Sequence, residues 1–343
     1  MAVASRIRPP HARRARLATA GVLTAVATLV VAACGSSGGT GSGATSSSTA
    51  SSEPTTAAAA PSTAAPSTAA PTSTAPTSAA PASTAAAPIA GVPARITSAG
   101  TIKVGSDITY PPMEFLATDG TTPNGFDIDL FTAVAAKLGV KATYENTKFD
   151  SILIGVQSGK YDVGLSSFGI TKDRLTSVNL VSYLSVGTQW AVKKGNPKGV
   201  QPDAACGKKV AVQTATTQET DLKARSTACT GAGKPAIDVL AEQDGQLPFT
   251  DVLTGKADAA LSDLVVVTDS LSKTNGQLET AGNSYGKAPF GYAVAKKDTA
   301  FAQALATATN ALIADGTYAT LATKWKVEDA KVATSLVNPA VKG

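Results

Sequence analysis

Histidine is almost absent from this chain of 343 residues, and its only copy is His11. From Cys34 onward the chain contains no imidazole side chain. This absence excludes Ser-His-Asp and Cys-His catalysis from that part of the chain, together with every metal site that requires a histidine ligand. We predict no catalytic residues, no bound metal and no cofactor.

The amino-terminal segment has the composition of an export signal. Five arginines precede an uncharged run over residues 17–33, and small residues stand directly before Cys34. This order is typical of a secretory signal peptide. Because Val31–Cys34 resembles the lipobox of bacterial lipoproteins, we predict cleavage after Ala33 and lipidation of Cys34. An uncleaved anchor is the alternative, since the run is just long enough to cross a bilayer.

The chain has no net charge once this leader is removed. The chain has 30 basic and 25 acidic residues, and all five charged residues before Cys34 are arginines, which leaves 25 of each sign. A pI near 9 is therefore no argument for a nucleic-acid partner. We predict that the protein binds no nucleic acid.

Cysteine is also scarce, because only Cys206 and Cys229 follow Cys34. Two cysteines in an exported protein are most simply bonded to each other, so we predict a disulfide. It would close a loop of about 24 residues and contribute about 3 kcal/mol to stability. A reactive thiol or a two-cysteine metal site is the less favoured alternative.

Residues 35–93 consist almost entirely of Ser, Thr, Ala, Pro and Gly. Such a segment cannot bury an apolar core, and regularly spaced prolines keep it extended. We therefore predict a disordered linker that tethers the folded part to the lipid anchor.

Strand and helix patterns alternate from about Arg95 onward. Short apolar runs predict strands at 101–105, 141–146, 162–166, 189–193, 209–213, 237–240, 257–262 and 290–295. Helices are predicted at 127–138, at 149–158 and around 249–253, and two others are predicted to begin after the N-cap residues Thr216 and Asp298. This alternation predicts an α/β fold with mainly parallel sheets flanked by helices.

The stretch 161–174 carries groups suited to binding an anion. An apolar run ends in Ser166, Ser167 and Gly169, and Arg174 follows shortly after. We interpret this as a buried strand that delivers a polar loop to the sheet edge where ligands bind in open α/β folds. Hydroxyls, backbone N–H groups and a guanidinium can together hold a carboxylate. A plain strand and turn with a solvated arginine is the alternative.

A similar frame, G-K-x-D-x-x-L-S-x, occurs at residues 159–167 and 255–263. Its last position is Ser167 in one copy and Asp263, a carboxylate that could hold a cation, in the other. Two facing lobes with these endings would suit the carboxylate and the ammonium of an α-amino acid. Within the frames, we expect Asp162 and Asp258 to fix the turn rather than to bind a ligand.

The segment Thr216–Glu219 predicts a capping box, with Thr216 as N-cap and Glu219 reaching back to it. The N–H groups of Thr217 and Gln218 would then lie at the positive end of a helix dipole, which favours an anion.

Six segments together resemble the amino-acid-type (family 3) extracellular solute-binding proteins of ABC importers, over roughly residues 95–330. They are IKVGSDITYPPMEF, NGFDIDLFTAVAAKLGV, FDSILIGVQSGKYDVGLSSFGITKDR, CGKKVAVQTATTQE, GKADAALSD and DGTYATLATKWKV. The resemblance implies a two-lobed, type II periplasmic-binding-protein-like clamshell with two hinge strands. The implied division is a leader at 1–33, a lipidated cysteine and linker at 34–93, lobe 1 at 94–186 and 289–333, lobe 2 at 187–288, and a tail at 334–343.

The resemblance also implies roles for individual residues. Arg174 would bind the α-carboxylate, helped by Ser167, by the N–H group of Gly169 and by the helix amino end at Thr217. Asp263 would bind the α-ammonium. Gly169 departs from the Ser or Thr that is common in the family at that place, so only its N–H is available. The candidate ligand-binding residues are Asp107, Tyr110, Phe149, Ser166, Ser167, Gly169, Arg174, Thr217 and Asp263.

We therefore predict a monomeric, lipid-anchored substrate-binding protein on the extracytoplasmic face of the cell membrane. It would capture a polar α-amino acid, cationic or neutral, and deliver it to an ABC transporter permease. A side chain that donates hydrogen bonds is favoured, either the cation of lysine, arginine or ornithine or the amide of glutamine, because an aliphatic one would leave the carboxylate of Asp107 desolvated and unpaired.

Two other functions stay open. One is an enzyme that resembles cyclohexadienyl dehydratases, for which Glu114 would be the nearest general acid. Asp263 argues against it, because prephenate has no ammonium. The other is a sensor that signals to a membrane partner.

Overall fold

The computed structural model describes residues 89–341. The predicted leader, Cys34 and nearly all of the predicted linker lie outside the described residues. Within residues 89–341, no helix combines the length and the apolar character that crossing a bilayer requires.

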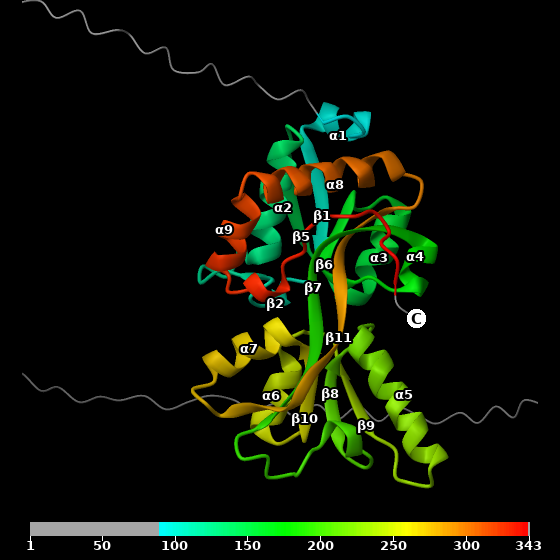
Figure 1. The fold of residues 1–343 in the computed structure, drawn as a ribbon, viewed down its shortest axis with the longest axis vertical. Helices are drawn as coiled ribbons and strands as arrows, with labels where there is room; N and C mark the ends of the chain where they lie inside the picture. The colour runs from blue at the N-terminus through cyan, green and yellow to red at the C-terminus, as the bar shows by residue number, and fades with distance from the viewer. Residues whose placement is uncertain (1–88, 342–343) are drawn as a thin grey trace, which may run out of the picture. The chain divides into compact units, whose positions relative to one another are not determined.

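Within this part of the chain, one eight-stranded sheet has the order β5-β1-β6-β11-β7-β10-β8-β9 (Figure 1). Three neighbouring strands run parallel at one end: β5 (Lys141–Asn146), β1 (Thr101–Ser106) and β6 (Val163–Gly169). Three more run parallel at the other end: β10 (Ala259–Asp263), β8 (Lys209–Gln213) and β9 (Asp238–Glu242). We call the part built around the first three strands lobe 1, and the part around the second three lobe 2.

The long strands β7 (Val178–Lys193) and β11 (Leu278–Ala295) pair antiparallel in the middle of the sheet and pass from one lobe into the other (Figure 1). Their pairing is irregular between Ala281 and Ala288. Opposite this segment, a Cβ atom at Gly187 would overlap the hydroxyl of Ser284. Glycine therefore allows the two strands to approach each other where they join the lobes.

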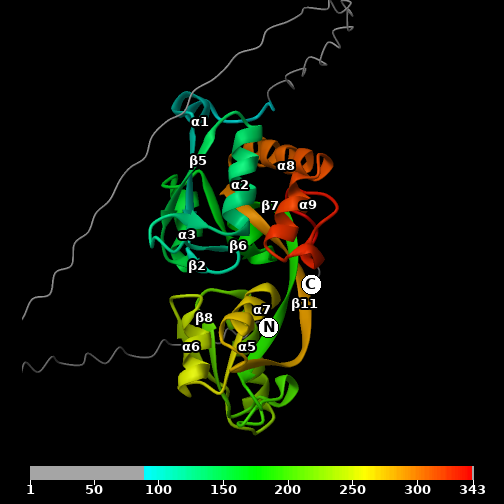
Figure 2. The same cartoon turned by 90° about the vertical axis from the view of Figure 1, so that its left-hand side faces the viewer.

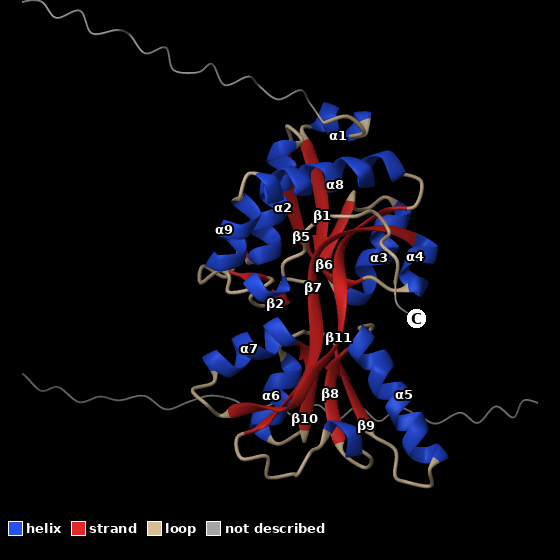
Figure 3. Cartoon of the chain, viewed as in Figure 1, coloured by secondary structure: helices blue, strands red, loops and turns tan. Residues whose placement is uncertain are grey.

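Helices lie on both sides of the strands in each lobe (Figures 2 and 3). The helices of lobe 1 are α1 (Ala94–Ala99), α2 (Phe126–Lys137), α3 (Phe149–Ser158), α4 (Lys172–Ser177), α8 (Thr299–Ala314) and α9 (Thr317–Lys324). Those of lobe 2 are α5 (Thr217–Gly231), α6 (Leu247–Thr254) and α7 (Leu264–Lys273). A small sheet of β2 (Thr109–Tyr110), β3 (Glu114–Leu116) and β4 (Pro123–Asn124) and the 3-10 helices Pro202–Ala204 and Glu328–Ala330 complete the fold. The predicted α/β fold with two lobes is confirmed.

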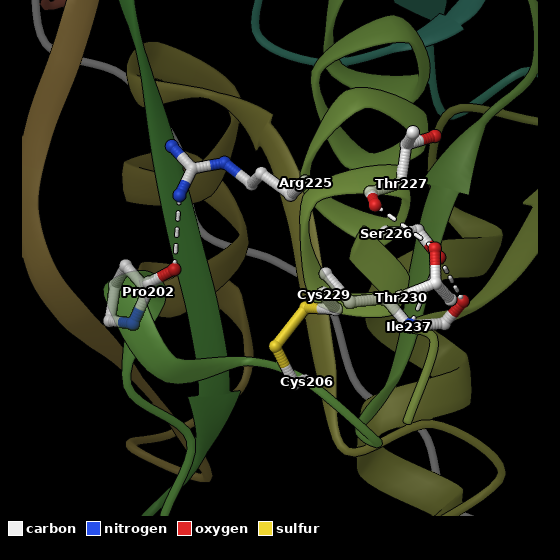
Figure 4. Close-up of a disulfide and its surroundings, with 8 residues drawn as sticks. All are labelled: Pro202, Cys206, Arg225, Ser226, Thr227, Cys229, Thr230 and Ile237. Atoms are coloured by element: carbon white, nitrogen blue, oxygen red, sulfur yellow. Dashed lines mark hydrogen bonds between the residues drawn. A yellow bond between two sulfur atoms is a disulfide. The ribbon is translucent and has the colours of Figure 1, made fainter. Parts of the chain in front are cut away.

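The disulfide between Cys206 and Cys229 confirms the predicted pairing (Figure 4). It joins the loop before β8 to α5. On the helix side, the Ser226 hydroxyl donates to the carbonyl oxygen of Ile237 at 3.1 Å. Because β8 and α5 both belong to lobe 2, the bridge lies wholly within that lobe.

Two predicted helix caps differ in detail. The hydroxyl of Thr216 accepts a hydrogen bond from Glu219 N at 3.1 Å, as predicted, but the Glu219 carboxylate accepts from Ala215 N at 2.7 Å and not from Thr216. Asp298 stands at the N-cap of α8 without a side-chain cap, because its carboxylate pairs with Arg95 at 2.7 Å. An ion pair with α1 has replaced the local hydrogen bond.

The residues after 333 pack along β7 in lobe 1. Ser182 N donates to the carbonyl oxygen of Leu336 at 2.9 Å, and Asn338 N donates to that of Leu180 at 2.8 Å. The segment predicted as a tail is therefore attached to the edge of a buried strand.

Candidate functional site

The carboxyl ends of four parallel strands, two from each lobe, surround one cavity. Asp107 follows β1, Ser167 lies near the end of β6, Gln213 ends β8 and Asp263 ends β10. The space between the lining side chains, including solvent at the opening, is about 350 Å³.

All nine candidate residues line this cavity. Residues from distant parts of both lobes thus come together as a site, and their roles toward a ligand stay predictions. Five further lining residues were not among the candidates: Glu114, Gln213, Thr216, Gln218 and Phe290. Thr216 and Gln218 belong to the predicted capping box and Gln213 ends a predicted strand, so position offered a signal for these three. Glu114 was considered only as the general acid of the alternative enzyme, and nothing in the sequence indicated that Phe290 would line the cavity.

Arg174 lies where the two lobes meet. Its guanidinium donates to the carbonyl oxygen of Gly169 at 2.8 Å and to that of Ala215, in lobe 2, at 3.0 Å. It also lies over the rings of Phe149 and Phe168, 5.5 and 5.3 Å from their centroids. Burial lowers the pKa of Arg174 to about 10, against the attraction of Asp263, so the side chain is a cation at neutral pH.

The loop before Arg174 approaches the amino end of α5. A Cβ atom at Gly169 would lie 3.7 Å from Arg174 Nη1 and 3.8 Å from Thr217 Oγ1. The guanidinium, the Gly169 backbone and the positive end of α5 therefore converge. Together they form a place for an anion such as a carboxylate.

Asp263 provides negative charge from lobe 2. Its Oδ1 accepts a hydrogen bond from Gln218 Nε2 at 2.7 Å, and its Oδ2 accepts one from the Tyr110 hydroxyl at 2.7 Å. Burial raises the pKa of Asp263 to about 6, while these two hydrogen bonds and the charge of Arg174 act in the opposite direction. The carboxylate is therefore mostly ionised at neutral pH and can hold a cation.

Asp107 provides a second negative charge, from lobe 1. Its Oδ1 accepts from the Thr109 hydroxyl at 2.8 Å, and its Oδ2 accepts from Phe149 N at 3.2 Å and from Gln213 Nε2 at 2.8 Å. Burial raises the pKa of Asp107 to about 6. Asp107 thus holds its own turn and also faces the cavity, so a structural role and a ligand-binding role do not exclude each other.

Aromatic side chains form walls of the cavity. Tyr110 is 7% exposed, and its hydroxyl also lies 2.9 Å from Ser262 Oγ. Phe149 stacks on Phe168 with ring centroids 4.8 Å apart. These surfaces would pack against the apolar part of a ligand or the face of a delocalised cation.

The two serines at the end of β6 turn their hydroxyls toward buried carboxyl groups. Ser166 Oγ donates to Glu114 Oε1 at 3.0 Å and accepts from Asp107 N at 3.2 Å. Ser167 has a φ of 48°, and its Oγ lies 3.3 Å from carboxyl oxygens of both Glu114 and Asp127. The hydroxyls are therefore held by lobe 1 itself.

The sequence profile of the bacterial extracellular solute-binding proteins, family 3, matches residues 102–328. The chain belongs to this family. Among its relatives, the arginine-binding protein ArgT of Corynebacterium glutamicum is 32% identical over 247 residues, which cover 72% of this chain and 81% of that protein. The L-cystine-binding protein TcyJ of Escherichia coli is 30% identical over 67% of this chain and 84% of its own length.

Solved structures of amino-acid-binding proteins agree with the fold. An ancestral arginine-binding protein bound to arginine has a TM-score of 0.61 and 32% identity, covering 66% of this chain and 98% of its own. An ancestral amino-acid-binding protein described as a precursor of cyclohexadienyl dehydratase has a TM-score of 0.61 and 30% identity, over 67% and 97% of the two chains. The similarity is thus to binding proteins, and the chain is an amino-acid solute-binding protein of the ABC-importer class, not an enzyme.

Proposed function

We propose that this family 3 protein captures a cationic α-amino acid, with arginine as the first candidate. The observation that carries the proposal is the charge of the cavity, where Asp107 and Asp263 face a single guanidinium, that of Arg174, while the carboxyl group of Glu114 is held by Ser166 and Ser167. If Arg174 and Asp263 pair with the α-carboxylate and the α-ammonium, the charge of Asp107 is left for the ligand side chain. A cation would neutralise it, beside the ring of Phe149.

The names of the relatives support this choice of ligand. They include arginine-binding proteins of Corynebacterium glutamicum and Pseudomonas aeruginosa and a lysine/arginine/ornithine-binding protein of Escherichia coli. The cystine-binding relative makes cystine the competing candidate.

A competition series by calorimetry tests the ligand, using arginine, lysine, glutamine, glutamate, leucine and cystine. We expect arginine or lysine to bind tightest, and at 100 times its Kd to add about 2.7 kcal/mol to the free energy of unfolding. The matched variant Asp107→Asn keeps the shape of the side chain but removes its charge, so it should lose the preference for arginine over glutamine. Tightest binding of glutamate or leucine would refute the proposal.

The same protein would act at the extracytoplasmic face of the cell membrane, as a monomer held by the lipidated Cys34 and the linker 35–93. From there it would hand the amino acid to an ABC transporter permease. The lipobox-like residues before Cys34 and the composition of the linker support this arrangement. A Cys34→Ala variant should appear in the culture medium instead of the membrane fraction, and equal membrane retention would contradict the anchor.

A further inference from the structure

Two buried carboxyl groups have no assigned role, one in the wall of the cavity and one behind it. Glu114 in β3 and Asp127 in α2 are both fully buried, with 0% exposure. The Ser167 hydroxyl lies 3.3 Å from an oxygen of each. Within residues 89–341, neither carboxyl group forms an ion pair with a lysine or arginine. Two carboxylates that share one hydroxyl donor away from water cannot both be ionised at modest cost.

The hydrogen bonds indicate which group is the anion. Asp127 Oδ2 accepts from the Tyr183 hydroxyl at 2.6 Å, from Ser167 N at 3.2 Å and from Ser167 Oγ at 3.3 Å. Glu114 has only the hydroxyls of Ser166 and Ser167 as donors among the described residues. The larger set, which includes a short bond from a phenol, favours charge on Asp127.

The other oxygen of Asp127 indicates where a proton is required. Asp127 Oδ1 is buried and has no hydrogen-bond partner among the described residues. Leaving such an acceptor unpaired is costly, so a donor is required there. A protonated carboxyl group is a donor, whereas a carboxylate is not.

We propose that Glu114 is a neutral carboxylic acid that donates its proton to Asp127 Oδ1, and that this pair positions Ser166 and Ser167 at the ligand cavity. Glu114 is then a positioning residue, acting on the ligand through the two serines. It adds no charge to the cavity, where Asp107, Asp263 and Arg174 leave one net negative charge. That single charge matches a ligand with one net positive charge, a consequence that rests on the proposed function.

The surroundings favour this protonation state. Burial raises the pKa of Glu114 well above its ordinary value, and the charge of Asp127 raises it further. Burial also raises the pKa of Asp127 to about 6, with the bond from Tyr183 acting against it. The other titratable groups around the pair are Tyr183 in β7, Tyr292 in β11, Tyr144 in β5, Asp107 after β1, and Arg174 and Asp263 across the cavity. The three phenols have raised pKa values and stay neutral.

The first test detects the proton directly in the ligand-free wild-type protein. Infrared spectroscopy after carbon-13 labelling of glutamate should show one protonated glutamate carboxyl group at pH 8, which disappears in Glu114→Gln. If the wild-type spectrum contains only ionised glutamates, the proposal is overturned. Because no ligand is used, this result is independent of whether arginine binds.

The second test uses the pH dependence of unfolding. A glutamate in an unfolded chain has a pKa of about 4.3. Because the pKa of Glu114 is raised in the folded protein, its protonation contributes fully to the free energy of unfolding below the unfolded pKa. This contribution falls as the pH rises toward the folded pKa. Over that window the folding constant of wild type relative to Glu114→Gln should fall up to tenfold per pH unit. Parallel pH profiles would contradict the proposal.

The third test separates positioning from simple space filling. Glu114→Ala should lower the affinity for the tightest-binding amino acid at least tenfold, because the serines lose their acceptor. Glu114→Gln, whose amide can donate to Asp127, should recover most of that loss. If Glu114→Gln binds the amino acid no more tightly than Glu114→Ala, the hydrogen bond to Asp127 does not position the site.

Discussion

The two copies of the G-K-x-D-x-x-L-S-x frame form the same structure in the two lobes up to their last residues. Gly159 is the C-cap of α3 and Gly255 is the C-cap of α6, both with a φ of 80°. Asp162 Oδ2 accepts from Lys103 N and Asp258 Oδ2 from Lys209 N, each at 2.9 Å. In both lobes the aspartate thus ties the start of its strand to the neighbouring parallel strand, β1 or β8.

The copies differ at the position that faces the cavity. Ser167 has a φ of 48° and β6 continues to Gly169, after which Arg174 lies in α4. Asp263 is extended, with a φ of −71°, and α7 begins at the next residue. The shared positions build a strand end, whereas the last position and the residues after it decide the charge presented there. The comparison teaches that a repeated frame identifies the edge of a site without identifying its chemistry.

The largest effect should come from removing the positive charge of Arg174, which follows the lobe 1 copy of the frame. Arg174→Ala should weaken ligand binding by roughly 2–5 kcal/mol, or about 30-fold to several-thousand-fold, because one partner of a buried charged pair is lost. Calorimetry measures this loss, and circular dichroism checks that the variant is folded. Arg174→Lys keeps the charge but not the planar guanidinium, so its ligand affinity should lie between those of wild type and Arg174→Ala. Affinity within threefold of wild type would remove Arg174 from the site.

The next effect concerns a feature that lobe 2 has and the described part of lobe 1 lacks, the disulfide. The double variant Cys206→Ser/Cys229→Ser should lose about 3 kcal/mol of unfolding free energy, because the loop between the cysteines is no longer closed in the unfolded chain. Urea unfolding measures the loss. Ligand affinity should be unchanged, since neither cysteine lines the cavity. Two free thiols in the exported wild-type protein would contradict the bond.

A third substitution copies the lobe 1 ending into lobe 2. Asp263→Ser should weaken binding of the amino acid by roughly 1.5–3 kcal/mol, the usual worth of a hydrogen bond to a charged group. The affinity for a ligand analogue without the α-ammonium should hardly change on the same substitution. Combining the change in the protein with the change in the ligand in a double-mutant cycle therefore gives the interaction energy between Asp263 and the α-ammonium. An equal loss for both ligands would show that Asp263 does not bind the ammonium.

The smallest effect tests the equivalence of the two frames. Asp162→Ala and Asp258→Ala should each cost about 1 kcal/mol of stability, because each removes the acceptor of one backbone N–H. Asp162 also pairs with Arg95 at 3.1 Å, but a partly exposed ion pair adds little. Chemical denaturation compares the two variants, and ligand affinity serves as the control. A change of affinity in either variant would mean that the frame does more than fix the turn.

Local patterns predicted much of this fold. Ile128, Phe131, Val134, Ala135 and Leu138 lie on one face of the helix predicted at 127–138, and all five are buried in the structure. Thr216 caps α5 as its sequence indicates. These features depend on residues a few positions apart, so backbone geometry and side-chain spacing are sufficient to predict them. Asp298 is an exception, because Arg95, 203 residues earlier, competes for its carboxylate.

By itself, the sequence determined the alternation of strands and helices in each lobe, the only cysteine pair after Cys34 and the polar groups at strand ends, but not the full length of the long strands β7 and β11. The tertiary structure alone decided which of these groups meet. Gln213 reaches Asp107 from 106 residues away, and Gln218 and Tyr110 converge on Asp263 from opposite lobes. Glu114 and Asp127 become a pair only because Ser167 lies between them. Such contacts depend on the order of strands in the sheet and on how the lobes approach, which no short stretch of sequence encodes.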